Sequence, residues 1–353
     1  MNVIRKAMAI AAALSLTLSA GACGADESSS ASSATTSATG PLTVVASVSQ
    51  WGSLAEQIGG DDVTVTSILS SSGVDAHGFE PTTSDVARIH KAGILVVNGA
   101  GYDSWATKNV SSSTSVVSAA ETVGAMDGDN PHLWFSKEAR DGMAKEIAET
   151  FSRILPSKKK DFEARLKSWQ SREKTLETTM TTFKTDHDAP VYGATEAVAY
   201  YLMSDLGFTD ATPKGYANAV ASEGEPSASD LQTFQGLIEK HKIDVLINNT
   251  QESSDAGSML LGTAGRSDVP VVDVSEQIPS DAQDLVSWIT SLVSSISDAL
   301  DSSSGTDSAS PDGTSSSSDS ASPSDSESSS DSPSASSSTS TTPSNEGQTD
   351  PGK

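Results

Sequence analysis

The sequence predicts an α/β protein of two lobes, each a mostly parallel sheet flanked by helices, joined by one long rigid helix. Three observations predict this architecture. Strand-like runs alternate with helical patterns from residue 42 to residue 300, as in βαβ crossovers. Residues 136–184 interrupt the alternation with many charges and almost no strand signal. At 353 residues, the chain is about as long as two ordinary domains.

The N-terminal lobe is expected over residues 41–155. The run LTVVASV has the apolar, β-branched composition of a buried strand, and SQWGSLAEQIG directly after it is helical in pattern. The run GILVVNG is another buried strand, and the helix before it places Val86, Ile89 and His90 on one face. The strands of this lobe are expected at 42–48, 62–69, 93–99 and 115–119, and its first helices at 49–59 and 83–92.

A single long helix is expected to connect the lobes over residues 156–185. Pro156 divides the charged stretch and is expected to lie near the first turn of this helix. The segment that follows carries four apolar residues at rough helical spacing and would run ~40 Å at 1.5 Å per residue. These apolar residues are Phe162, Leu166, Trp169 and Leu176.

The C-terminal lobe is expected over residues 186–301. IDVLINN is the clearest buried strand of the chain, and LVSWITSLVSSISDAL closes the lobe as an amphipathic helix. The strands are expected at 189–195, 243–249 and 269–275, and the helices at 196–207, 227–242 and 285–300.

The first 22 residues read as an export signal. Arg5 and Lys6 precede the apolar run AMAIAAALSLTL, which is too short to span a bilayer as a mature helix, and small residues then lead to Cys23. This arrangement resembles a bacterial lipoprotein signal, in which Cys23 becomes the lipidated first residue. A plain secretory signal with an incidental cysteine is the alternative. Residues 23–40 have the composition of a flexible linker.

Composition excludes several classes of function. Lys and Arg total 22 against 47 Asp and Glu, a net charge of −25, and no basic face for nucleic acid is visible. One cysteine excludes a disulfide framework, an iron–sulfur cluster and a thiolate zinc site. Residues 302–353 contain eight acidic residues, one Lys and Ala as the only hydrophobic type, so we expect a disordered Ser/Asp/Pro-rich tail.

Two of the five histidines follow predicted strands, where open α/β sheets bind ligands. His77 lies in SGVDAHGFEPTTSDV after the second strand, and His132 lies in GDNPHLWFS after the fourth. We assign packing, surface or helix-end roles to His90, His187 and His241. His77 and His132 are therefore the candidate metal-binding imidazoles.

Several motifs, in order along residues 42–300, resemble the metal-specific (zinc/manganese) solute-binding lipoproteins of bacterial ABC transporters. DAHGFEPTTSDVARIHKAGILVVNGAGYDSW is similar to the first signature of that family, with a ligand His followed three residues later by Glu-Pro. NPHLWFS is similar to the second, a ligand His before Leu-Trp. The similarity continues through GATEAVAYYLMSDLGF, PKGYANAVASEGEPSASDLQ, IDVLINNTQ and VPVVDVSEQIP.

The resemblance implies a site of four metal ligands, two from each lobe. His77 and His132 are two of them. Glu196 takes the position where zinc members often carry a His and manganese-type members a carboxylate, which favours manganese or a mixed site. The fourth is Glu276, because SEQIP resembles an element of some relatives, or alternatively Asp273. Two neutral imidazoles and two carboxylates would balance a divalent cation. The resemblance also implies that Glu80, three residues after His77, fixes the loop that carries His77.

The resemblance implies an extracytoplasmic, lipid-anchored protein on the outer face of the cell membrane. It would capture Zn²⁺ or Mn²⁺ as a transported ligand between the lobes, without a catalytic cofactor. It would deliver the ion to a membrane permease, while ATP hydrolysis occurs on another subunit, since no P-loop GxxxxGK[ST] is present. We expect a monomer that is not an enzyme. A cell-surface adhesin of the same family and a metallohydrolase are the alternatives.

Overall fold

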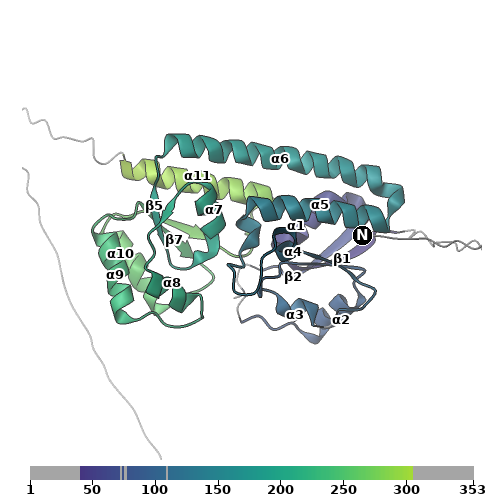
Figure 1. Cartoon of the computed structure of the whole chain (residues 1–353), viewed down its shortest axis with the longest axis horizontal. Helices are drawn as coiled ribbons and strands as arrows, with labels where there is room; N and C mark the ends of the chain where they lie inside the picture. The colour runs from purple at the N-terminus through teal and green to yellow at the C-terminus, as the bar shows by residue number, and fades with distance from the viewer. Residues whose placement is uncertain (1–39, 72–73, 75–77, 109, 305–353) are drawn as a thin grey trace, which may run out of the picture. The chain divides into compact units, whose positions relative to one another are not determined.

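The computed structural model describes residues 40–71, 74, 78–108 and 110–304, and it contains two separate four-stranded sheets (Figure 1). The first sheet has the order β2-β1-β3-β4, and every pairing in it is parallel. All four residues of β3 are buried, as expected for a strand covered by helices on both faces. Its strands are β1 (Leu42–Val48), β2 (Val63–Leu69), β3 (Ile94–Val97) and β4 (Ser115–Ser118).

Three of the helices around the first sheet, α2, α4 and α5, begin after a residue whose side chain caps the first turn. Thr82 and Asp85 form a capping box at the start of α2, and the Ser136 hydroxyl accepts the Ala139 amide hydrogen at the start of α5. Ile89 of α2 is buried, but His90 is exposed, so its predicted place on the apolar face was wrong. The helices are α1 (Ser49–Gly59), α2 (Thr83–Lys91), α3 (Ser104–Thr107), α4 (Ala119–Val123) and α5 (Lys137–Ile154).

The second sheet has the order β6-β5-β7-β8 and is also entirely parallel. Three of its elements, β6, α8 and α10, were not predicted from the sequence. The strands are β5 (Val191–Ala194), β6 (Thr209–Asp210), β7 (Val245–Asn249) and β8 (Val271–Val274). The helices are α7 (Tyr200–Asp205), α8 (Lys214–Val220), α9 (Ala228–Glu239), α10 (Asp255–Arg266) and α11 (Leu285–Ser304). Single 3₁₀ turns lie at Gly60–Asp62, Leu133–Phe135, Pro156–Lys158 and Ala197–Ala199.

The predicted connecting helix is α6 (Lys159–Asp186), which follows the 3₁₀ turn that Pro156 begins. It contacts α1 and α5 of the first lobe and α11 of the second (Figure 1). Three of its four predicted apolar residues are buried, while Leu166 is half-buried. Glu173 is buried as well, because it pairs with Arg140 of α5.

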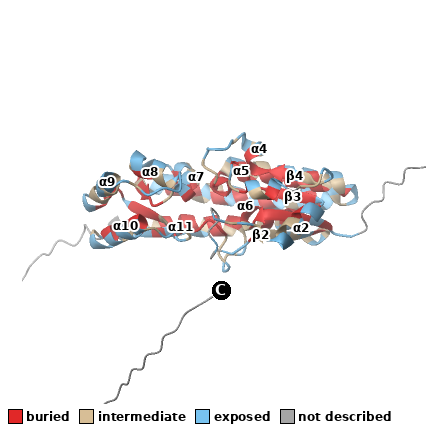
Figure 2. Cartoon of the chain, turned by 90° about the horizontal axis from the view of Figure 1, so that it is seen from below, coloured by how far each residue is buried: buried red, intermediate tan, exposed pale blue. Residues whose placement is uncertain are grey.

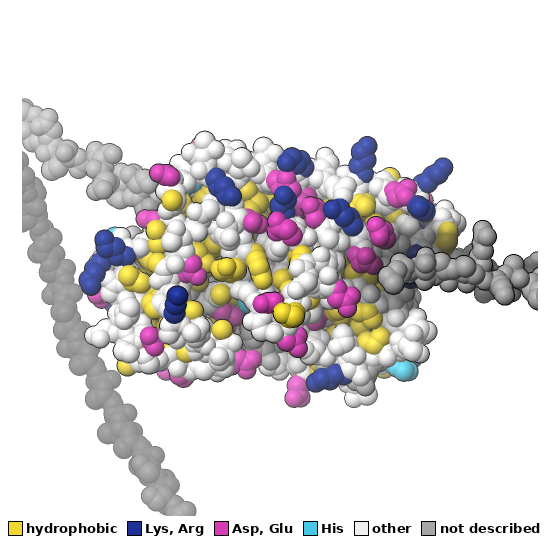
Figure 3. Space-filling view, viewed as in Figure 1, with side chains coloured by type: hydrophobic (Ala, Val, Ile, Leu, Met, Phe, Trp, Pro, Cys, Tyr) yellow, Lys and Arg dark blue, Asp and Glu magenta, His cyan; other side chains and the backbone are white. Residues whose placement is uncertain are grey.

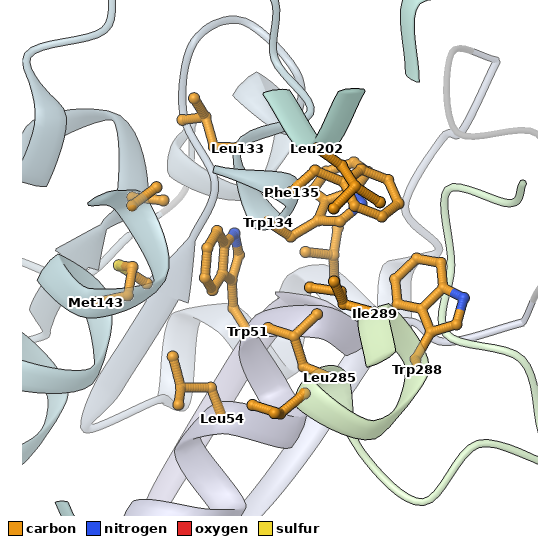
Figure 4. Packing of buried hydrophobic residues seen from close by; sticks show 14 of the residues in the cluster. Trp51, Leu54, Leu133, Trp134, Phe135, Met143, Leu202, Leu285, Trp288 and Ile289 are labelled. Carbon is orange, nitrogen blue, oxygen red and sulfur yellow. The ribbon is translucent and has the colours of Figure 1, made fainter. Parts of the chain in front are cut away.

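One continuous cluster of buried apolar side chains includes residues of both sheets (Figures 2 and 4). Trp134 and Phe135 occupy the 3₁₀ turn after β4, and the Phe135 ring lies 5.2 Å from the Trp288 ring of α11. Leu202 of α7 belongs to the same cluster, beside these rings (Figure 4). The lobes are therefore joined by a shared core as well as by α6.

Several expectations fall at the ends of the chain. The signal peptide over 1–22, the site of lipidation at Cys23 and all of the linker except residue 40 lie outside the described residues. Helix α11 continues to Ser304, three residues into the segment expected to be disordered, and the rest of that segment also lies outside them. Within the described part of the chain, no helix combines the length and apolar character needed to cross a membrane.

Candidate metal centre

A cleft of about 490 Å³ lies where the loops after β3, β4 and β5 meet α8. Its lining includes His132 and Glu196, together with the acidic side chains of Asp129, Asp210 and Glu223. Asp and Glu side chains appear in the middle of the face in Figure 3, and many Lys and Arg side chains follow the upper edge, near α6. An acidic cleft favours the approach of a cation.

His132 is the imidazole that the structure places in this cleft. It precedes the 3₁₀ turn Leu133–Phe135, its ring packs edge-on against Trp134, and the residue is 3% exposed. The Asn130 side-chain carbonyl oxygen accepts the His132 backbone amide hydrogen and lies 2.9 Å from the ring Nδ1. The Asn130 amide nitrogen donates to the Ala197 carbonyl, so its oxygen must face His132. In the neutral form of the ring, Nδ1 therefore carries the proton, and Nε2 offers its lone pair.

Two carboxylates from the second lobe face His132 Nε2. Glu196 follows β5, and its Oε1 lies 3.8 Å from Nε2. Glu276 follows β8, and its Oε2 lies 3.9 Å from the same nitrogen. One ligand atom from each of the three residues can be chosen so that all lie within 4.8 Å of one another. The site thus brings together donors from three loops and both lobes.

Asn249, at the end of β7, binds both carboxylates through one amide nitrogen. Its Nδ2 donates to Glu196 Oε2 at 2.6 Å and to Glu276 Oε1 at 3.0 Å. The Tyr102 hydroxyl donates to Glu276 Oε2 at 2.6 Å. Burial, and then the charge of Glu276, raise the pKa of Tyr102 well above its usual value, so the phenol keeps the proton that it donates.

The backbone of Glu276 is held from both lobes. The Gln50 side chain of α1 donates to the Glu276 carbonyl, and the Gln251 side-chain oxygen accepts the Glu276 amide hydrogen. On the opposite side, Asp103 anchors the turn that carries Tyr102 by accepting the amide hydrogens of residues 98 and 99. Burial raises the pKa of Asp103, and these hydrogen bonds oppose that effect. The carboxylate of Glu276 is therefore positioned before any cation arrives.

This geometry suits a small divalent cation. Ligands of a tetrahedral zinc ion lie roughly 3.4 Å apart, given metal–ligand bonds of about 2.0–2.1 Å. The two distances to His132 Nε2 exceed this separation by about half an ångström, so small rotations of the side chains would complete the coordination. A neutral His132 and two carboxylates carry the charge of −2 that a divalent ion cancels.

The structure separates the two candidates for the fourth ligand. Glu276 is 1% exposed and faces His132, whereas Asp273 lies in β8 with its side chain exposed. Asp273 accepts a hydrogen bond from Asn248. Because side chains alternate along a strand, Asp273 points away from its buried neighbours Val272 and Val274.

The predictions for two other site residues, His77 and Glu80, stay predictions. His77 lies outside the described residues. Glu80 is exposed, and the loop that it was expected to fix includes His77. Sequence reasoning missed Asn249, Tyr102 and Asn130, which orient the ligands. The available signal was that all three lie in segments similar to the family, Tyr102 in the first signature, Asn130 in NPHLWFS and Asn249 in IDVLINNTQ.

Comparison with known proteins identifies similar chains. Residues 44–299 match the family described as "ZnuA: Zinc-uptake complex component A periplasmic". The "Zinc-binding protein AdcA" of Streptococcus pyogenes serotype M6 is 23% identical over 230 residues. That alignment covers 56% of this chain and 44% of AdcA, so the chain matches less than half the length of that relative.

Two solved structures share the fold. The periplasmic zinc binding protein TroA of Treponema pallidum superposes with a TM-score of 0.64 at 20% identity, over 74% of this chain and 99% of TroA. A Mn-bound mutant of a periplasmic metal binding protein from Candidatus Liberibacter asiaticus superposes with a TM-score of 0.60 at 20% identity, over 73% and 99% of the two chains. Two parallel sheets joined by a long helix are thus the architecture of these proteins too.

Proposed function

This chain belongs to the family of periplasmic A components of zinc-uptake complexes, and from that premise we propose that it is the solute-binding component of an ABC transporter. It captures a divalent transition metal between its lobes and delivers the ion to a membrane permease. The observation that carries the proposal is the cluster of His132 and Glu276, both buried, with the half-buried Glu196, whose ligand atoms lie within 4.8 Å of one another.

The proposed ligands are His132 Nε2, Glu196 Oε1 and Glu276 Oε2. Glu276, not Asp273, is the carboxylate from the last loop, since only Glu276 faces the imidazole. The resemblance to the family adds His77 as the fourth ligand. Because the donors come from both lobes, the ion holds the lobes together, and its release requires that these contacts loosen.

The cargo is Zn²⁺ or Mn²⁺, and the protein carries no catalytic cofactor. Imidazole nitrogen and carboxylate oxygen bind both ions, so donor type alone does not choose between them. The similar proteins include both metals: AdcA and TroA are named as zinc-binding, and the Liberibacter protein is named as Mn-bound.

The proposed partners follow from the family. They are a membrane permease that receives the ion and an ATPase that drives uptake. A lipid on Cys23 would hold the protein at the outer face of the cell membrane, near the permease, and raise its effective concentration there. We propose a transport role without enzymatic activity.

Calorimetric titration with Zn²⁺ and Mn²⁺ tests this function directly. The purified chain should bind at least one of these ions with one site per molecule. Glu196→Gln and Glu276→Gln should each weaken binding at least about 100-fold, given that even residues behind the ligands contribute 10–100-fold. Asp273→Asn, a matched change at an exposed carboxylate outside the cleft, should bind as the unaltered chain does. Failure of that chain to bind either ion at micromolar concentration would refute the proposal.

A further inference from the structure

Arg140 of α5 and Glu173 of α6 form an ion pair that protein encloses on all sides. The two residues are 0% and 1% exposed, and Arg140 donates to Glu173 Oε1 from Nε at 3.0 Å and from Nη2 at 2.5 Å. Burial of two charges costs desolvation free energy that their attraction does not always repay, so a buried pair is weak evidence for stability alone. The other contacts of the pair therefore bear on its role.

A further contact of Arg140 leads toward the metal centre. Its Nη1 donates to the Trp134 carbonyl oxygen at 3.1 Å. Trp134 is the middle residue of the 3₁₀ turn that directly follows His132. Because the guanidinium is a rigid planar fork, its two contacts with Glu173 also fix the direction of Nη1. The ion pair thus holds the backbone of this turn in place relative to the connecting helix α6.

The Trp134 ring packs against the imidazole that faces the two carboxylates. The centroids of the Trp134 and His132 rings are 5.3 Å apart at an interplanar angle of 85°, and those of Trp134 and Tyr102 are 5.2 Å apart at 67°. Trp134 is 0% exposed, and a closely packed interior transmits a shift of one side chain to its neighbours. A displacement of the turn would therefore move His132 Nε2 relative to Glu196 and Glu276.

We propose that Arg140 is a positioning residue for metal binding, which ties the turn after His132 to the connecting helix through Glu173. The inference rests on the proposed function and adds a residue that acts on a ligand through another side chain. If the pair served stability alone, metal affinity would follow stability in every variant. The two roles differ in the atoms that matter, since positioning depends on Nη1 at the Trp134 carbonyl and the ion pair depends on Nε and Nη2.

Arg140→Met combined with Glu173→Leu should weaken metal binding without weakening the fold. Apolar side chains of similar volume often replace a buried ion pair at little cost in stability, so the midpoint of urea unfolding of the metal-free protein should stay close to that of the unaltered chain. The Trp134 carbonyl loses its guanidinium donor in this double variant. In calorimetric titration with Zn²⁺ or Mn²⁺, whichever the unaltered chain binds, Kd should rise about tenfold, the lower end of the effect of residues behind metal ligands.

Glu173→Gln should have the opposite pair of effects. Glutamine has the size of Glu173 and keeps an oxygen that can accept from Arg140, so Nη1 should stay at its carbonyl while the buried positive charge loses its counter-ion. The urea midpoint should fall, and Kd should stay unchanged. Arg165→Met is the matched control, because this arginine of α6 also binds a carboxylate and a carbonyl, those of Asp62 and Gly59 at the end of α1, and its loss should leave Kd unchanged.

Arg140→Lys keeps the test decisive if the double variant does not fold. Lysine retains a positive charge beside Glu173 but lacks the fork that also reaches the Trp134 carbonyl, so the same rise in Kd is expected. An unchanged Kd in the folded double variant or in Arg140→Lys would overturn the inference while the proposed function stands, as would a Kd that rises in Glu173→Gln in step with its loss of stability. Absence of binding of both Zn²⁺ and Mn²⁺ by the unaltered chain would instead remove both proposals.

Discussion

Glu276→Gln should abolish the stabilisation that metal gives to this protein. A ligand present at 1,000 times its Kd stabilises the folded state by about 4.1 kcal/mol. For a folded region of this size, each kcal/mol moves the melting temperature by roughly 2–4 °C, so saturating metal should raise that temperature by about 8–16 °C. The variant loses a charged ligand that faces His132 Nε2 at 3.9 Å, and its shift should be close to zero.

In the metal-free protein, Glu276→Gln should not lower the melting temperature. Ligand atoms of Glu196 and Glu276 lie within 4.8 Å of each other, where two like charges repel by about 3–4 kcal/mol at an effective dielectric constant near 20. Hydrogen bonds from Asn249 and Tyr102 offset part of this repulsion. Because the substituted side chain carries no charge, the metal-free variant should melt no lower than the unaltered chain.

Scanning calorimetry with and without Zn²⁺, after treatment with a chelator, measures both effects. Asp273→Asn is the control, since this exposed carboxylate binds Asn248 and should leave the metal-induced shift intact. A purely structural Glu276 would give the reverse pattern, with a lower melting temperature in the metal-free variant and an undiminished response to metal. That result would refute the assignment of Glu276 as a ligand.

Three further predictions concern residues that are not proposed as metal ligands. Glu173→Leu leaves the buried charge of Arg140 unpaired and should lower the free energy of unfolding by about 3–5 kcal/mol in urea titrations, with most of it recovered in the double variant with Arg140→Met. Burial by itself would raise the pKa of Asp284. The hydrogen bonds from the Ser287 backbone amide and the Arg172 guanidinium outweigh burial, so the pKa of Asp284 lies below its usual value. Asp284→Asn should therefore destabilise the protein at neutral pH, and its difference from the unaltered chain in thermal melts should shrink as pH falls below about 4 and through the lowered pKa of Asp284. Asn130→Leu removes the partner that sets the His132 tautomer and should weaken metal binding roughly 10–100-fold in competition with a chromophoric chelator.

Much of the fold could be predicted from the sequence, because strong local patterns of apolar and charged residues agree with the observed strands and helices. The apolar runs at β1, β3 and β7 are buried strands, and the charged stretch after residue 136 forms α5 and α6. The elements that escaped prediction have weak local signals. Strand β6 is two residues long, and α10 contains three glycines, which lower its intrinsic helix propensity.

Some residues of the candidate site could be predicted from the sequence, and others could not. The motifs around His132 and Glu196 single out these two residues, and the structure places both in one cleft. The sequence favours Glu276 over Asp273 only through the resemblance of SEQIP to an element of some relatives, whereas the structure shows that Glu276 faces the imidazole and that Asp273 is exposed on β8. Asn249 lies within IDVLINNTQ, a segment similar to the family, but that similarity does not indicate its contact with both carboxylates.

The amino-acid sequence by itself determined the two-lobed parallel architecture and the kinds of donor atom, since periodicity and residue chemistry are local properties. Only the tertiary structure decided which oxygen of each carboxylate faces His132 and that one amide nitrogen holds both carboxylates. The physical reason is that these contacts join residues at least 27 positions apart, whose meeting depends on how the strands are ordered and how the lobes share a core.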